Sequence, residues 1–82
     1  MQGVARLDAE QKYLLLMVDR SIMEIGAEGW APVSTIMLSL IGKIPPELID
    51  LELVGNEGGG RVRLTALGAS LIEAMAWLGV NE

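Results

Sequence analysis

The chain has 82 residues, of which 51% are hydrophobic, and its six basic and eleven acidic side chains give a net charge of −5 at pH 7. This length supports one domain with a small core, and the negative charge opposes association with nucleic acid or an anionic membrane unless basic side chains gather locally. The chain lacks cysteine and histidine, which removes disulfides, cysteine-based zinc sites, the strongest nucleophile and the commonest general base, so we predict a protein without cofactor or metal that is not an enzyme.

The uncharged stretches of the chain do not indicate a membrane segment. The longest runs from Gly29 to Gly42 and contains glycine, proline, serine and threonine, whereas a bilayer span needs about 20 mostly apolar residues. Residues 1–6 lack the apolar core of a signal peptide. We therefore predict a cytoplasmic protein without membrane contact.

The first helix is predicted from Asp8 to Ile25, after an N-terminal tail of residues 1–7. Asp8 is a favourable N-cap, and Gln11 stands at the spacing of a capping box. Apolar residues recur every three or four positions and predict the buried stripe, which consists of Leu14, Leu15, Val18, Ile22 and Ile25. Further apolar residues lie beside this stripe, and two of them, Met17 and Met23, are candidate contacts of a homodimer.

A turn, a short strand and two further helices are predicted next. Residues 26–29 form the turn, and Trp30 begins the strand and is expected to cover the junction of the sheet with the first helix. Pro32 suits the first turn of a second helix that ends at Gly42. The prolines at positions 45 and 46 are expected to open a third helix that reaches about Leu51.

A hairpin and a last helix complete the predicted domain, which spans residues 8–79 and leaves 80–82 as a tail. Leu51 and Leu53 alternate with Glu52, and Val62 and Leu64 alternate with two arginines, which predicts two strands with one apolar face turned inward. The tip is rich in glycine. Thr65 is the expected cap of the last helix, which has Leu67, Leu71, Met75 and Leu78 as its apolar stripe and Gly79 just past its end.

This order of elements, and above all two segments of sequence, resembles a winged helix-turn-helix domain. The segments are residues 48–54, which read LIDLELV, and residues 61–68, which read RVRLTALG, on either side of the glycine-rich tip. The resemblance covers residues 8–78 and implies an α+β, mostly helical fold with a three-helix core, a short β-hairpin wing and a C-terminal helix. It also implies a transcription regulator that binds duplex DNA, with the third helix in the major groove and the wing on phosphate.

The predicted nucleic-acid contacts follow from this resemblance and from the few basic residues of the second half of the chain. Lys43, Arg61 and Arg63 would contact phosphate, and hydrogen bonds would come from Ser34, Thr35 and Asn56. An alternative for the two arginines is that they protect an exposed strand and pair with Glu52 or Glu57.

A second interpretation of the whole chain is a protein-interaction module that keeps this fold without binding DNA. The predicted third helix carries Glu47 and Asp50 and none of the side chains that usually read purine edges. The hydrophobic fraction is also large for a chain of 82 residues. This interpretation predicts an exposed apolar patch on the first or last helix, or an acidic groove around Glu47, Asp50 and Glu52. Trp77 lies off the centre of the apolar stripe of the last helix and is expected either at the edge of the core or in the contact of the homodimer.

Overall fold

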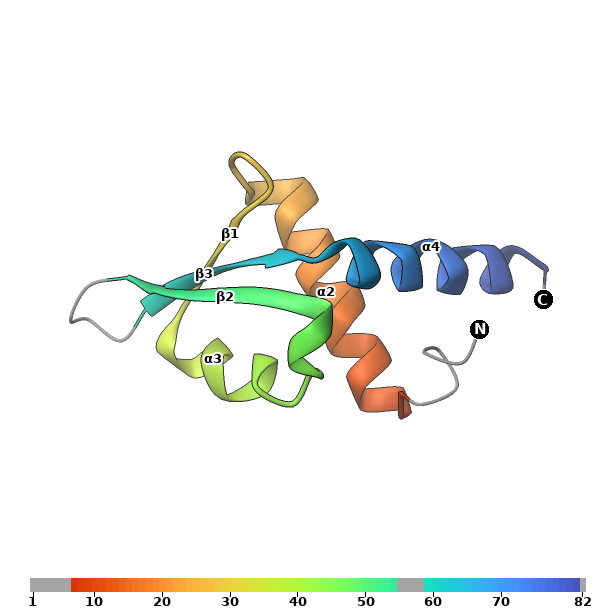
Figure 1. Cartoon of the computed structure of the whole chain (residues 1–82), viewed down its shortest axis with the longest axis horizontal. Helices are drawn as coiled ribbons and strands as arrows, with labels where there is room; N and C mark the ends of the chain where they lie inside the picture. Colours follow the sequence, from red (N-terminus) through yellow and green to blue (C-terminus); the bar gives the residue numbers. More distant parts are fainter. Residues whose placement is uncertain (1–6, 55–58, 82) are drawn as a thin grey trace.

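The computed structural model describes residues 7–54 and 59–81, with side chains as far as residue 76 (Figure 1). The described residues form a small α+β fold that is mostly helical, as the sequence predicts at the level of fold class. Its elements are listed in chain order: helix α2 (Ala9–Ile25), strand β1 (Ala31–Val33), helix α3 (Thr35–Ile41), the 3-10 helix η1 (Pro46–Leu48), strands β2 (Ile49–Val54) and β3 (Gly59–Leu64), and helix α4 (Ala66–Asn81).

Helix α2 begins and ends where the sequence predicts. The Asp8 carboxylate accepts a hydrogen bond from the Gln11 backbone N–H at 2.7 Å, and the Gln11 side chain accepts one from the Asp8 N–H at 3.1 Å, which is the predicted capping box. Leu14, Leu15 and Val18 are buried, as expected. Ile25 is exposed, because the chain leaves the helix at this point.

Pro32 lies in β1 and not in the first turn of a helix, which corrects the prediction. It is placed opposite Arg61 of β3, between the pairs Ala31–Val62 and Val33–Gly60. Proline costs the sheet no hydrogen bond in an edge strand when its nitrogen faces away from the neighbouring strand. Helix α3 consequently starts three residues later, with Ser34 as its N-cap, and the hydroxyl of Ser34 accepts a hydrogen bond from the Met37 N–H at 3.3 Å.

The predicted third helix is reduced to the three residues of η1, which is the largest difference from the sequence prediction. Pro45 is the N-cap of η1, Pro46 to Leu48 form a single 3-10 turn, and β2 already begins at Ile49. Leu48 and Ile49 are both buried in the core, and residues 49–54 pair with β3, so the chain leaves the helical conformation where the sheet begins. The prediction had counted residues 49–51 as helical.

The three strands form an antiparallel sheet in the order β1-β3-β2. Its inner face carries Ala31, Val33 and Val62, which are buried beneath α2 and α3. Leu51 and Leu53 share this face with Val62, in line with the predicted alternation, but their side chains are 43% and 69% exposed. The outer half of the hairpin extends past the helices toward the tip, as Figure 1 shows.

Helix α4 leaves the sheet at Thr65 and runs away from the hairpin tip, so that β3 and α4 form one long line across the molecule (Figure 1). The Thr65 hydroxyl accepts a hydrogen bond from the Gly68 N–H at 3.1 Å and donates one to the Glu47 carbonyl at 2.8 Å, so the predicted cap also ties α4 to η1. Leu71 is buried and Leu67 is half exposed. The helix continues to Asn81, whereas the sequence predicts that it ends near Leu78, before Gly79. Leu7, assigned to the predicted tail, is buried in the core.

Candidate functional site

The outer face of the sheet holds a continuous row of interacting side chains, which we call the sheet ladder and define as Trp30, Arg61, Arg63, Asp50 and Glu52. Both guanidinium groups lie over the Trp30 ring, with their carbon atoms 4.3 Å (Arg61) and 4.7 Å (Arg63) from its centroid. Cations at this distance are attracted by the negative face of the ring. Trp30 is therefore the stacking partner of both arginines and does not cover the junction of the sheet with the first helix.

The same two arginines pair with carboxylates of the neighbouring strand. Arg61 Nη2 is 3.0 Å from Glu52 Oε1, and Arg63 Nε is 2.9 Å from Asp50 Oδ2. The register explains both pairs, because Glu52 is directly opposite Arg61 and Asp50 is directly opposite Arg63. This is the alternative pairing that the sequence left open, with Glu52 as one partner. The sheet ladder has two positive and two negative groups and is neutral.

Lys43, the third predicted phosphate contact, is separated from the sheet ladder. Its ammonium group is 3.3 Å from Glu10 in the first turn of α2, and its carbonyl accepts a hydrogen bond from the Gln11 side chain at 3.1 Å. Trp30 follows the other end of this helix, which is about 25 Å long at 1.5 Å per residue. The structure therefore does not bring Lys43 together with Arg61 and Arg63.

The predicted hydrogen-bonding residues have different places. Ser34 is used as the N-cap of α3, and Thr35 is the first residue of that helix and is exposed. Asn56 and Glu57 are outside the described residues. Among the predicted nucleic-acid contacts that the structure describes, only Arg61 and Arg63 are brought together.

Of the two predicted dimer residues on α2, Met17 is partly buried against the core and Met23 faces solvent. Met23 is 78% exposed, and Tyr13 and Leu16 are exposed on the same helix. A shallow depression of about 230 Å³ is lined by Tyr13, Leu16, Met17 and Arg20. We call Tyr13, Leu16 and Met23 the α2 outer stripe. Trp77 lies in α4, but its side chain is outside the described residues.

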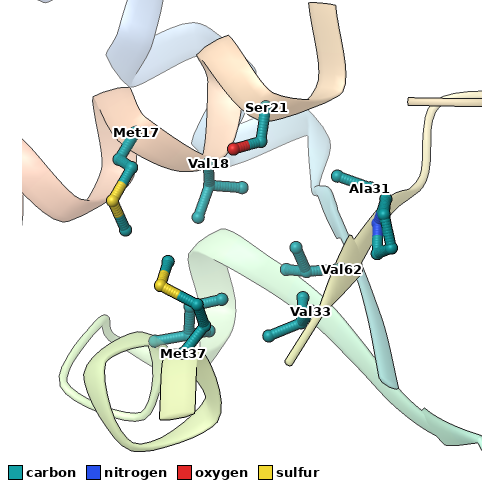
Figure 2. A pocket seen from close by; sticks show the side chains of 9 residues that line it. Met17, Val18, Ser21, Ala31, Val33, Met37 and Val62 are labelled. Atoms are coloured by element: carbon teal, nitrogen blue, oxygen red, sulfur yellow. The ribbon is translucent and has the colours of Figure 1, made fainter. Parts of the chain in front are cut away.

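The space between α2, α3 and the sheet is too small for a ligand. Figure 2 shows Met17 and Val18 of α2 facing Met37 of α3 and Val33 and Val62 of the sheet across this space. It has a volume of about 20 Å³, close to that of one water molecule, whereas pockets for small molecules measure about 300–1,000 Å³. It is a packing gap of the core.

A larger groove opens on the surface beside the edge of β2. It has a volume of about 350 Å³, and its lining contains no polar side chain: Ile41, Gly42, Ile44, Pro46, Ile49 and Leu51. The sequence does not predict this groove, because its lining combines the end of α3, the 42–46 connection and β2. The only signal for it in the sequence was that Leu51 and Leu53 are apolar residues on a short hairpin.

Among residues 7–54 and 59–81, no helix combines the length and apolar character that a bilayer span requires. Comparison of the chain with known protein families, with curated proteins and with solved structures found no match.

Proposed function

We propose that this protein is a non-catalytic protein-interaction module on a scaffold of the winged-helix type. The proposal rests on the ion pairs that the three predicted phosphate contacts already form. Lys43, Arg61 and Arg63 each have a carboxylate partner within 3.3 Å. A phosphate group would have to displace Glu10, Glu52 and Asp50 in a chain whose net charge is already −5.

The winged-helix part of the proposal rests on the order of the elements. A helix, a short strand, a second helix, one helical turn and a hairpin follow one another, and the first strand pairs with the second strand of the hairpin. In this comparison η1 takes the position of the recognition helix. One 3-10 turn of three residues presents too few side chains to read base edges along a groove.

Exposed apolar surface supports a protein partner. The α2 outer stripe and the β2 side of the hairpin both place large apolar side chains in solvent, and the two surfaces belong to different parts of the fold. Apolar patches of this kind mark contact surfaces in folded proteins more often than isolated exposed side chains do.

Fluorescence anisotropy with a labelled mixed-sequence DNA duplex tests this proposal, at about 50 mM and then about 200 mM salt. We expect no salt-sensitive binding by the wild-type protein. The double variant Asp50→Asn/Glu52→Gln keeps the shape of both side chains and removes their charge, which frees both arginines. We expect this variant to gain weak binding that the higher salt concentration abolishes.

The control combines that double variant with Arg61→Ala and Arg63→Ala, which should remove the gained binding. The nucleic-acid prediction would be restored if the wild-type protein bound at low salt and each arginine substitution lowered the slope of log K against log salt by about one unit.

A further inference from the structure

Within residues 7–54 and 59–81, strand β2 pairs with β3 on one side and with no strand on the other, so it is an edge of the sheet along its whole length. The Thr65 N–H donates to the Leu48 carbonyl at 3.1 Å, which places this pair of residues in the hydrogen-bonded type of antiparallel pair. Hydrogen-bonded and non-hydrogen-bonded pairs alternate along two antiparallel strands. The backbone N–H and C=O groups of Asp50 and Glu52 are therefore directed to β3. Leu51 and Leu53 direct theirs to the open edge.

Pro32 supports this assignment independently. By the same alternation, Arg61 directs its backbone groups to β2, and its pair with Pro32 of β1 has no hydrogen bonds. The nitrogen of Pro32 therefore points away from the sheet, where proline needs no N–H. The other edge of the sheet is thus partly blocked by a short strand with a proline. The β2 edge has six residues and neither proline nor lysine, which are residues that commonly protect edges.

The two faces of the β2 edge differ in chemistry. On the inner face, Leu51 borders the apolar groove of about 350 Å³ and Leu53 is 69% exposed. On the outer face, Asp50 and Glu52 are the last groups of the sheet ladder, and their arginine partners lie on the side away from the edge. A strand added here would have its side chains alternately beside apolar groups and beside carboxylates.

We propose that the β2 edge binds an extended protein segment in which apolar residues alternate with lysine or arginine. The segment adds a fourth, antiparallel strand to the sheet, and its backbone groups bond to those of Leu51 and Leu53. Its apolar side chains enter the groove, and its cations lie beside Asp50 and Glu52. The absence of polar side chains from the groove lining favours such a segment over a small molecule, which needs polar groups for its orientation.

Charge selects this occupant over a second copy of the chain. Two β2 strands paired about a twofold axis would bring Asp50 and Glu52 of one copy beside the same residues of the other, and like charges on neighbouring strands are unfavourable. A basic segment extends the alternation of charge that already runs across the sheet from β3 to β2. This inference rests on the proposed function and names the class of partner.

The test uses the wild-type protein and a fluorescein-labelled peptide with blocked ends that alternates valine and lysine over six positions, the length of β2. Two further versions carry N-methyl groups, one on the valines and one on the lysines. In an antiparallel arrangement, the valine N–H groups face β2 and the lysine N–H groups face solvent. We expect methylation of the valines to weaken binding at least about tenfold and methylation of the lysines to leave it within about twofold.

Amide hydrogen exchange provides a second measurement on the same complex. The Leu51 and Leu53 amides should exchange quickly in the free protein and slow at least about tenfold in the presence of the peptide. The Asp50 and Glu52 amides, which bond to β3, should be protected in both states and serve as internal controls.

A peptide of the same composition with its valines and lysines in separate blocks is the control for non-specific attraction to an acidic protein. Equal binding of the alternating and the block peptide, or equal effects of the two methylation patterns, would overturn the inference of strand addition. No binding of any peptide would also overturn it, while the proposed function would still be decided by the DNA titration and its arginine variants.

Discussion

The ring of Trp30 fixes the environment of the two arginines on the outer face of the sheet. Two arginines stack on its ring and at the same time pair with carboxylates across the sheet. Each exposed ion pair contributes only about 0–1 kcal/mol to stability, so the sheet ladder matters less for folding than for the chemistry of the surface. It holds two cations in a neutral arrangement that has little attraction for phosphate.

Gly68 is required by the contact between α4 and η1. A Cβ atom at this position would overlap the Leu48 carbonyl oxygen and would lie 3.1 Å from the carbonyl carbon. Both atoms belong to the backbone of η1, so the clash cannot be relieved by a side-chain rotation. This explains in physical terms why a glycine occurs near the start of the last helix.

We expect Gly68→Ala to lower the free energy of unfolding by about 1–3 kcal/mol, because overpacking against the backbone exceeds the gain of about 1 kcal/mol in helix propensity. Urea unfolding followed by circular dichroism measures the change. Gly42→Ala is the matched control: its Cβ would be 3.4 Å from the nearest atom and its φ of −59° suits alanine. That variant should be more stable by about 0.4–1 kcal/mol, and a stable Gly68→Ala variant would contradict the proposed contact.

At the scale of elements, the turn between α2 and β1 contains a local strain. Ala27 and Trp30 form an isolated antiparallel bridge with hydrogen bonds of 2.8 and 3.1 Å, and the two residues between them have positive φ, 57° for Glu28 and 83° for Gly29. These values are typical of a type I′ turn, in which asparagine is favoured at the first central position. Glutamate has no such preference.

We therefore expect Glu28→Asn to raise the free energy of unfolding by about 0.5–1 kcal/mol, since asparagine tolerates the left-handed conformation better than glutamate. Thermal unfolding of the two proteins under identical conditions measures the difference. Glu28→Gln removes the charge and keeps the length of the side chain, so it should change stability by less than about 0.5 kcal/mol. An equal gain in both variants would assign the effect to charge and not to the backbone.

The elements also show how packing changes predicted boundaries. The sequence predicts a longer helix at the place of η1, because Pro45 and Pro46 are tolerated in the first turn of a helix. In the fold, Leu48 is buried in a 3-10 turn and Ile49 is buried as the first residue of β2, which pairs with β3. The pairing of residues 49–54 with β3 thus replaces most of the predicted third helix with a strand.

At the scale of the whole molecule, the shape limits how much apolar surface can be buried. The principal extents are 43 × 22 × 18 Å, and the core lies between α2, α3 and the sheet. An elongated molecule of this size has a large surface relative to its volume, which leaves the α2 outer stripe without cover. Association of two copies through this stripe would bury it.

We expect the protein to form a dimer in sedimentation velocity experiments, and we expect Met23→Glu to shift it toward the monomer. Burial of the new carboxylate in an apolar contact would cost several kcal/mol. Ile36→Glu is the control, because Ile36 is equally exposed at 80% but lies on α3 and not on α2. A wild-type protein that stays monomeric at high concentration would refute this dimer.

The sequence by itself determined the elements whose signals are local. The capping box of α2, the N-cap at Thr65, the hairpin and the α+β class all follow from spacings of three or four residues, or from alternation over a few positions. Such patterns reflect hydrogen bonds and faces within a single element, and these do not depend on the rest of the chain. The two arginines were also correctly expected on the outer face of the hairpin.

Only the tertiary structure decided how these elements are used. Trp30 and Arg61 are far apart in the sequence, and they meet because β1 pairs with β3 and not with β2. The apolar groove combines residues of α3, the following connection and β2, so it exists only after the sheet has packed on the helices. Which strand has a free edge, and which charges neutralise one another, depends on long-range register, and local sequence patterns do not encode that register.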